Sequence, residues 1–346
     1  MNLLLHDDWE IYGDGTGDPH KLMFEPAKRI LDICDRYEAK YTFYAEIGQQ
    51  LCMRNAPQTK WQKIANLWEE ILVDAVNRGH DVQLHFHPQW IGAEQKKGEW
   101  HLDYSKWHTG HVEDLLLDQW IGKGKKYLES LLCQSNTSYK VVSYRAGGWL
   151  CQPSNALYYA LRNNGIICDV SVMKGRYAIY EDNSYVDFRN AVSRYEPWEV
   201  DPGNFAREKS GSGVWELPVY TTTSTLPQSL YLLKTAFQPL HYYRIYQKRK
   251  QQPGIGRKGM NPVISGRKKE YYGSFGYMHY RHLLKYIYQV QSIYHSVGFM
   301  KEPYITLLTH SKSFLDFNNF EHFLRHIAVD SEVRFSTTLE YVTHNL

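Results

Sequence analysis

The stretches DVQLHFH, residues 81–87, and LLLHDD, residues 3–8, decide the fold class and the chemistry that we expect. Each begins with an apolar pattern typical of a buried strand and ends in side chains that can bind a metal ion. Successive side chains on a strand point to opposite faces, so His85 and His87 are predicted to share one face. Two imidazoles beside a carboxylate can supply three ligands of a catalytic zinc-type site and leave a position for water.

The pair Asp7-Asp8 follows the first predicted strand and can divide two tasks. We predict that Asp8 binds the metal with His85 and His87, and that Asp7 is the base that accepts a proton from water. Taken singly, an Asp pair in a surface turn or a His pair on an open strand edge would carry no chemistry. Together at strand ends, the four residues indicate a metal-dependent hydrolase.

Short apolar runs alternate with helical patterns along the chain. We predict strands at residues 3–5, 41–45, 81–87, 141–145, 166–172, 214–220 and 304–308, helices at 26–37, 61–75, 115–132, 153–164, 280–295 and 319–326, and a last strand and helix from residue 333 onward. Such alternation indicates an α/β fold with a parallel sheet. In a parallel barrel the chemistry sits at the carboxyl ends of the strands, and the candidate residues lie there: Asp7, Asp8, His85, His87, Arg145 and His310.

Arg145 closes the fourth predicted strand and is followed by Gly147 and Gly148. An arginine beside a carboxylate lowers its pKa and fixes its orientation, which makes Arg145 a candidate catalytic residue; a surface salt bridge is the alternative. The glycines indicate a close approach of the backbone to a ligand. Trp149 and Trp90 are candidate substrate-binding rings for a sugar, although either ring could serve only for packing.

Two further polar residues end apolar runs. His310 closes LLTH, residues 307–310, where it can donate a proton to a leaving group as a general acid; alone it would be an ordinary loop histidine. Asp169 closes IICD, residues 166–169, where it can steer an imidazole or line the substrate site. A cap or turn role is equally compatible with this position.

The bulk composition fits one domain over residues 1–346, with 43% hydrophobic residues for a large core. A net charge of +3 is too small to indicate a nucleic-acid partner. Five cysteines without CxxC spacing argue against a disulfide framework. No apolar run approaches the ~20 residues of a membrane span, and Asp7 comes too early for a preceding signal peptide. We therefore expect a cytoplasmic enzyme.

Residues 225–275 interrupt the alternation and form a predicted basic insertion. Its cations cluster between Arg244 and Lys269 among glycines and prolines. A solvated, flexible insertion is one interpretation. The other is a surface for an anionic substrate, lipid phosphate or membrane headgroups.

Five motifs in order resemble the polysaccharide deacetylase family, carbohydrate esterase family four. They are His-Asp-Asp at 6–8, Gly-His-Asp-Val-Gln-Leu-His-Phe-His-Pro at 79–88, Arg-Ala-Gly-Gly-Trp at 145–149, Glu-Leu-Pro-Val at 216–219 and Leu-Thr-His at 308–310. The resemblance runs from Leu3 to about Phe314, without the insertion.

The motifs depart from the family pattern in three places. His87 comes two positions after His85, whereas the family pair is spaced by four positions. His6 precedes the Asp pair, and Ala-Gly follows Arg145 in place of a Pro-containing turn. Other imidazoles near the second motif could replace His87 as a ligand: His80, His101, His108 and His111.

The resemblance implies a distorted (β/α) barrel of seven or eight strands that removes acetyl groups from sugars with zinc or a similar divalent ion. It implies a base at Asp7, metal ligands at Asp8, His85 and His87, and functional roles for Arg145 and His310. Without an export signal, the expected substrate is a nucleotide-linked or lipid-linked precursor of a surface polysaccharide. Another metal-dependent amide hydrolase and a barrel that binds glycan without turnover are the alternatives.

Overall fold

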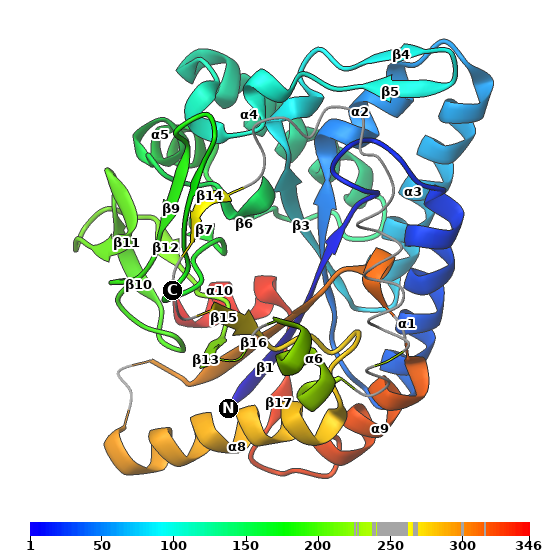
Figure 1. Ribbon diagram of the computed structural model, residues 1–346. Coiled ribbons are helices and arrows are strands. Elements are labelled where there is room, and N and C mark those ends of the chain that lie inside the picture. Colours follow the sequence, from blue (N-terminus) through cyan, green and yellow to red (C-terminus); the bar gives the residue numbers. More distant parts are fainter. Residues whose placement is uncertain are drawn as a thin grey trace.

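A curled sheet lies at the centre of the computed structural model (Figure 1). The structure describes residues 1–224, 226, 228–236, 240, 262–265, 269–298, 301–314 and 316–346. The strands of the sheet are β1 (Asn2–Trp9), β2 (Thr42–Glu46), β3 (Asp81–Phe86), β6 (Ser143–Ala146), β7 (Cys168–Asp169), β10 (Trp198–Asp201), β11 (Asn204–Glu208), β12 (Trp215–Glu216), β16 (Tyr304–Thr309) and β17 (Arg334–Phe335). Their order is β11-β10-β12-β7-β6-β3-β2-β1-β16, and β17 also pairs with β1.

Most of this sheet is parallel. Parallel ladders join β12, β7, β6, β3, β2, β1 and β16 in turn, and β17 is parallel to β1, so the parallel part has eight strands. β10 and β11 add an antiparallel extension. Within the described residues no ladder joins β16 to β11, so the sheet is an open, curled form of a barrel. The predicted fold class, a distorted (β/α) barrel with seven or eight parallel strands, is confirmed.

Helices surround the curled sheet (Figure 1). They are α1 (Glu25–Arg36), α2 (Ile47–Asn55), α3 (Thr59–Asn77), α4 (Asp114–Leu132), α5 (Asn155–Asn163), α6 (Gln228–Thr235), α8 (Tyr280–Val297), α9 (Phe317–Ile327) and α10 (Thr338–Asn345). In α1, for example, Ile30, Leu31 and Cys34 recur at helical spacing and are buried. One-turn helices follow three of the strands that end at the site: Pro88–Trp90 after β3, Gly147–Trp149 after β6 and Ser311–Ser313 after β16.

The first strand is longer than predicted. β1 continues to Trp9, because its ladder with β16 reaches Asp7 and its ladder with β2 covers His6–Trp9. His6, Asp7 and Asp8 therefore lie within the strand and not after it. The alternation of a strand then separates Asp7 from Asp8 and places His6 and Asp8 on the same face.

Small sheets occupy the segments between the main elements. β8 (Tyr177–Tyr180), β9 (Tyr185–Asp187) and β14 (Pro262–Ser265) form one, β13 (Thr221–Ser224) and β15 (Lys269–Tyr272) a second, and β4 (Glu94–Lys96) and β5 (Glu99–His101) a third. α6, β14 and β15 fall within the predicted insertion at 225–275. Its basic residues from Arg244 to Lys258, and Arg267 and Lys268, lie outside the described residues. The single-domain prediction stays a prediction.

None of the helices in the described part of the chain is both long and apolar enough to span a membrane.

Candidate active site

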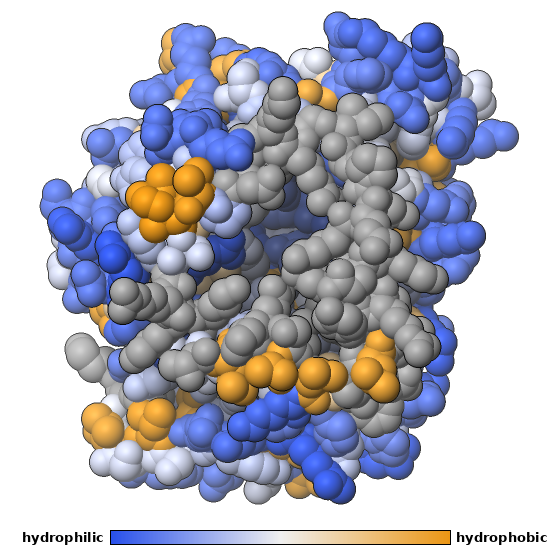
Figure 2. Space-filling view, in the orientation of Figure 1, coloured by the Kyte–Doolittle hydropathy of each residue, from blue (hydrophilic) through white to orange (hydrophobic). Residues whose placement is uncertain are grey.

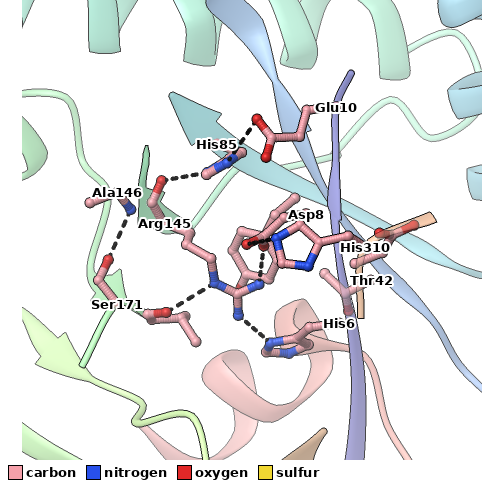
Figure 3. Close-up of polar contacts among 12 residues, drawn as sticks. His6, Asp8, Glu10, Thr42, His85, Arg145, Ala146, Ser171 and His310 are labelled. Carbon is pink, nitrogen blue, oxygen red and sulfur yellow. Dashed lines mark hydrogen bonds and ion pairs between the residues drawn. The ribbon is translucent and has the colours of Figure 1, made fainter. Parts of the chain in front are cut away.

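Polar side chains from four strands of the sheet meet at their carboxyl ends (Figure 3). His6 and Asp8 point from β1 toward this point, and Glu10, two residues further, continues the same alternation. His85 comes from β3, Arg145 from β6, and His310 directly follows β16. Such a convergence is the usual place for chemistry in a parallel β/α sheet. We call the side of β1 that carries His6, Asp8 and Glu10 its site face.

Glu10, His85 and His87 form a buried cluster whose potential ligand atoms all lie within 4.8 Å of one another. Glu10 Oε2 lies 2.9 Å from His87 Nε2 and 3.8 Å from His85 Nε2. Burial alone would raise the pKa of Glu10, but the adjacent His87 and Lys312 outweigh it and hold the pKa well below its usual value. Glu10 is thus an ionised carboxylate. Lys312 Nζ donates to its other oxygen at 2.6 Å.

The His85 ring is oriented in the way that a metal ligand requires. Its Nδ1 lies 2.9 Å from the Arg145 carbonyl oxygen, which can only accept, so Nδ1 carries the proton. The unprotonated Nε2 is then buried and has no hydrogen-bond partner. Burial lowers the pKa of His85 to about 4, which keeps the lone pair on Nε2 free at neutral pH. A lone pair held in this way fits a metal ion.

His87 completes the cluster from the position after β3. Its Nδ1 lies 3.1 Å from the side-chain amide of Gln89, which also contacts the Gly13 carbonyl. Gly147 lets the β6 turn approach the ring, because a Cβ at this position would lie 2.5 Å from His87 Nδ1. Two histidines and one carboxylate are a common ligand set of catalytic zinc. The residues present therefore fit a divalent metal ion.

Asp8 lies beside the cluster, between Arg145 and His310 (Figure 3). Arg145 Nη1 donates to Asp8 Oδ1 at 2.5 Å, and His310 Nε2 is 3.5 Å from Asp8 Oδ2. Burial would raise the pKa of Asp8, but the positive charge of Arg145 holds it below the usual value. Burial lowers the pKa of His310 to about 4. The group provides a charged carboxylate next to a neutral imidazole.

Asp7 points to the opposite side of β1 from Asp8. Its carboxylate accepts hydrogen bonds from the backbone N–H of Ser311, at 2.8 Å, and from the Ser311 hydroxyl. Burial raises the pKa of Asp7 to about 7, despite these two hydrogen bonds. The structure thus brings together Asp8, His85, His87, Arg145 and His310 of the predicted site, and places Asp7 behind the strand. The predicted roles of Asp7 as base and Asp8 as ligand stay predictions.

The three predicted substrate-binding residues lie around this centre in different settings. Trp149 has a left-handed backbone, with φ of 68°, and its ring centroid is 5.5 Å from the Arg145 guanidinium carbon. Trp90 is buried and packs edge-on against Trp100. Asp169 is fully buried and accepts hydrogen bonds from the backbone and hydroxyl of Ser171. Their contact with substrate stays a prediction.

Asp169 also faces a second buried carboxyl group, Glu216 on β12. Burial raises the pKa of Asp169 to about 6 and that of Glu216 well above its usual value. Glu216 Oε1 accepts the Val172 N–H, while Oε2 is buried without a donor. Glu216 carries a proton on Oε2 and donates it to Asp169, which explains both the raised pKa of Glu216 and the lack of a donor to Oε2. Asp169 thus pairs with a carboxyl group, that of Glu216. One of our predictions for Asp169 was an imidazole partner.

The sequence interpretation missed Glu10, Gln89 and Lys312. Glu10 could have been found if the first strand had been extended, since His6, Asp8 and Glu10 recur at the strand period of two. Of the alternative imidazoles, His80 pairs with Asp35 at 3.0 Å and His108 Nδ1 accepts the Gly110 N–H. Neither belongs to the cluster with Glu10.

Comparisons with known proteins give similarity in structure alone. No protein-family model matches the sequence, and no curated protein matches it. The chain is similar to a putative polysaccharide deacetylase from Mycobacterium smegmatis, with 12% identity, coverage of 99% of this chain and 90% of that chain, and a TM-score of 0.47. A 4-alpha-glucanotransferase from Thermococcus litoralis has 11% identity, coverage of 99% and 39%, and a TM-score of 0.49. A family 4 carbohydrate esterase from Streptomyces lividans has 12% identity, coverage of 49% and 61%, and a TM-score of 0.29.

Polysaccharide deacetylases and family 4 carbohydrate esterases are thus among the solved structures similar to this chain, as the sequence motifs led us to expect. At these identities and TM-scores the similarity assigns no activity. The function has to be argued from the residues of the site.

Proposed function

We propose that the protein is a metal-dependent hydrolase that removes an acetyl or related acyl group from an amino sugar. One observation carries this proposal. The unpartnered His85 Nε2 faces the Glu10 and His87 side chains, directly beside the carboxylate of Asp8 and the ring of His310. Metal ligands, a base and a proton donor are the parts that amide hydrolysis requires.

Glu10, His85 and His87 would hold the metal ion, with zinc as the first candidate. When bound, such an ion polarises an acyl carbonyl and lowers the pKa of water. Glu10 is positioned for this by Lys312, which contacts its second oxygen. The backbone carbonyl of Arg145 fixes the ring of His85, and the Gln89 amide contacts that of His87. Such supporting contacts commonly fix the orientation of metal-binding histidines.

Asp8 is the base in this proposal. It lies on the site face of β1 beside the metal ligands, and Arg145 keeps it ionised, so at neutral pH it can accept a proton from the attacking water. Asp7, the base predicted from the sequence, is on the other side of the strand and bound to Ser311. The alternative assignment, with Asp7 as base and Asp8 as a ligand, makes different predictions for the two variants, which are given below.

His310 completes the proton transfer. Its pKa is lowered to about 4, so the ring is neutral at pH 7 and can accept a proton. Its Nε2 is 3.5 Å from Asp8, so the proton that Asp8 takes from water can pass to His310. His310 then delivers this proton to the departing amine nitrogen as the C–N bond breaks. The proton count balances without a proton from solvent.

The activity is tested by acyl release. Protein that has been stripped with a chelator and protein reloaded with Zn²⁺, Co²⁺ or Mn²⁺ are incubated with a panel of N-acetylated and O-acetylated sugars, and acetate is measured. We expect release only from the reloaded protein. If the loaded protein releases no acyl group from any sugar, a barrel that binds glycan without turnover is the better account.

We also propose that the substrate is carried on an anionic nucleotide or lipid, as the basic insertion suggested. What supports this is a set of exposed apolar side chains in the described part of the insertion: Leu230 and Leu233 of α6, and Val263 and Ile264 of β14. Figure 2 shows apolar patches on this face at the places of α6 and β14. Apolar side chains next to cations are typical of contacts with membranes and anionic lipids.

Charge neutralisation tests this second part. Replacement of Lys248, Arg249 and Lys250 by Gln should raise KM for a diphosphate-linked acetylated sugar and leave KM for a small neutral sugar unchanged. Equal effects on both substrates, or none on either, would leave the insertion as a solvated segment. Binding to vesicles with and without anionic lipid separates a lipid carrier from a nucleotide carrier.

A further inference from the structure

Arg145 is fully buried, and each of its three kinds of N–H group has a partner. Nη1 donates to Asp8 at 2.5 Å, Nε donates to the Val170 carbonyl at 3.0 Å, and Nη2 donates to His6 Nδ1 at 2.7 Å (Figure 3). The first contact belongs to the site described above. The third involves a residue to which the proposed reaction gives no role.

The hydrogen-bond directions fix the state of His6. A guanidinium group can only donate, so His6 Nδ1 must accept and carries no proton. The proton of the neutral ring is therefore on Nε2, which lies 2.8 Å from the Thr338 hydroxyl and donates to it. Burial, together with the charge of Arg145, lowers the pKa of His6 well below its usual value and agrees with this neutral form.

Thr338 gives the ring a rigid support. It is the first residue of α10, and its backbone N–H donates to the Thr42 hydroxyl of β2 at 3.1 Å. The Tyr44 hydroxyl donates to the Thr338 hydroxyl at 3.4 Å, and the Tyr44 ring lies 4.0 Å from the Arg145 guanidinium carbon. The chain of contacts runs from α10 through His6 to Arg145, and from there to Asp8.

We propose that His6 is a positioning residue that acts as a neutral acceptor and fixes the guanidinium of Arg145 against Asp8. Neutrality matters because a carboxylate at this position would compete with Asp8 for the positive charge of Arg145. An uncharged acceptor fixes the geometry and leaves Asp8 as the carboxylate partner of the guanidinium. The proposal rests on the proposed function through the role of Asp8 as the base.

Two variants of His6 separate positioning from simple packing. His6→Phe keeps a ring beside Tyr44, whose centroid is 4.9 Å away, but offers no acceptor to Arg145. Misplacement of a catalytic group by about 1 Å can cost about 100-fold in rate, so we expect kcat of His6→Phe to fall by about 10- to 100-fold. KM and metal content should not change. His6→Gln offers both an acceptor and a donor and should restore most of kcat.

His80→Phe is the matched control. It removes another buried histidine, one that pairs with Asp35 away from the site, and should leave kcat unchanged. If His6→Phe does not fold, Thr338→Val takes its place, because it removes the acceptor for His6 Nε2–H and keeps the branched shape. Thr338→Val should also lower kcat.

A readout without substrate keeps this inference separate from the proposed function. In protein with ¹⁵N-labelled histidine and arginine, we expect the Nε2–H tautomer of His6 at pH 7 and distinct, slowly exchanging Arg145 Nη signals. In His6→Phe the Arg145 signals should broaden or merge. If the wild-type protein releases no acyl group, the proposed function is overturned. The Arg145 signals still show in that case whether His6 fixes the guanidinium. Unchanged Arg145 signals in His6→Phe, or an active enzyme with unchanged kcat, would overturn the inference.

Discussion

The two faces of β1 carry adjacent carboxylates with opposite properties. On the site face, Asp8 meets Arg145 and His310, and its pKa is held below the usual value. On the opposite face, Asp7 meets the N–H and hydroxyl of Ser311, and its pKa rises to about 7. Both side chains are buried, so burial does not distinguish them. The difference is that a full positive charge compensates Asp8, whereas neutral donors alone compensate Asp7.

This comparison separates the residues that we propose act on a substrate from residues that support the strand. The site-face carboxylate is ionised and lies among the groups to which we assign proton transfer and metal binding. The carboxylate behind the strand ties β1 to the turn after β16, in the same layer in which Trp9 packs against Phe43 and Trp68. Variants of the two faces should therefore differ in kind as well as in size.

The largest effect is expected for Asp8→Asn. Asn keeps the shape of the side chain but cannot accept the proton of water, and loss of a general base costs about 10²–10⁴-fold in rate. Metal content and fold should be retained, because Glu10, His85 and His87 remain. Steady-state kinetics with a parallel metal determination checks this. Loss of the metal from Asp8→Asn would make Asp8 a ligand, as the sequence alone suggested.

A smaller effect is expected for Gln89→Leu. Gln89 contacts the Nδ1 of His87, and loss of such a supporting contact typically costs about 10- to 100-fold in metal affinity. Titration of the stripped protein with Zn²⁺ against a competing chelator measures this. Gln62→Leu is the control, since Gln62 caps the Ala56 carbonyl near the start of α3. Equal affinities of the two variants would mean that the Gln89 amide does not orient His87.

For Asp7→Asn we expect a change in stability and little change in kcat. The folded-state pKa of Asp7, about 7, lies above the unfolded value near 3.8. The folded state thus holds this proton more tightly, and the resulting stability is present in full at low pH and lost as the pH rises through about 7. Each unit of pKa shift corresponds to about 1.4 kcal/mol.

Asp7→Asn removes this titration, so the loss of stability between pH 5 and pH 9 should be smaller than in wild type. Urea denaturation at both pH values measures the difference. A variant that keeps its metal but loses activity as strongly as Asp8→Asn would return Asp7 to the role of base and would contradict the division between the two faces.

Much of the fold could be predicted from the sequence. Periodicity located α1, α3, α4 and the parallel strands β2, β3 and β16, because long amphipathic helices and apolar runs give strong local signals. α2 was missed: its nine residues have weak amphipathic character, and its start depends on the Glu46 carboxylate, which accepts the Gly48 N–H. The small sheets between Tyr177 and Tyr272 were also missed, since their strands of three or four residues carry almost no pattern.

Most of the residues of the candidate site could be predicted from the sequence, but Glu10 and the supporting contacts of Gln89 and Lys312 could not. His85 and His87 follow from strand alternation, and Arg145 and His310 follow from their positions at strand ends. Glu10 did not follow, because the polar residues after Leu5 suggested that the first strand had ended. Its continuation depends on ladders with β16 and β2, which are contacts between segments distant in the sequence.

The metal content of Glu10→Gln tests the account most directly. Glu10→Gln, Asp8→Asn and wild type are loaded with Zn²⁺, dialysed side by side and analysed by mass spectrometry for bound metal, with circular dichroism to confirm the fold. We predict that Glu10→Gln loses the metal, since an amide replaces the anionic ligand, while Asp8→Asn keeps one ion per chain like wild type. A folded Glu10→Gln that keeps its metal, beside an Asp8→Asn that loses it, would contradict the ligand set and the role of Asp8 together.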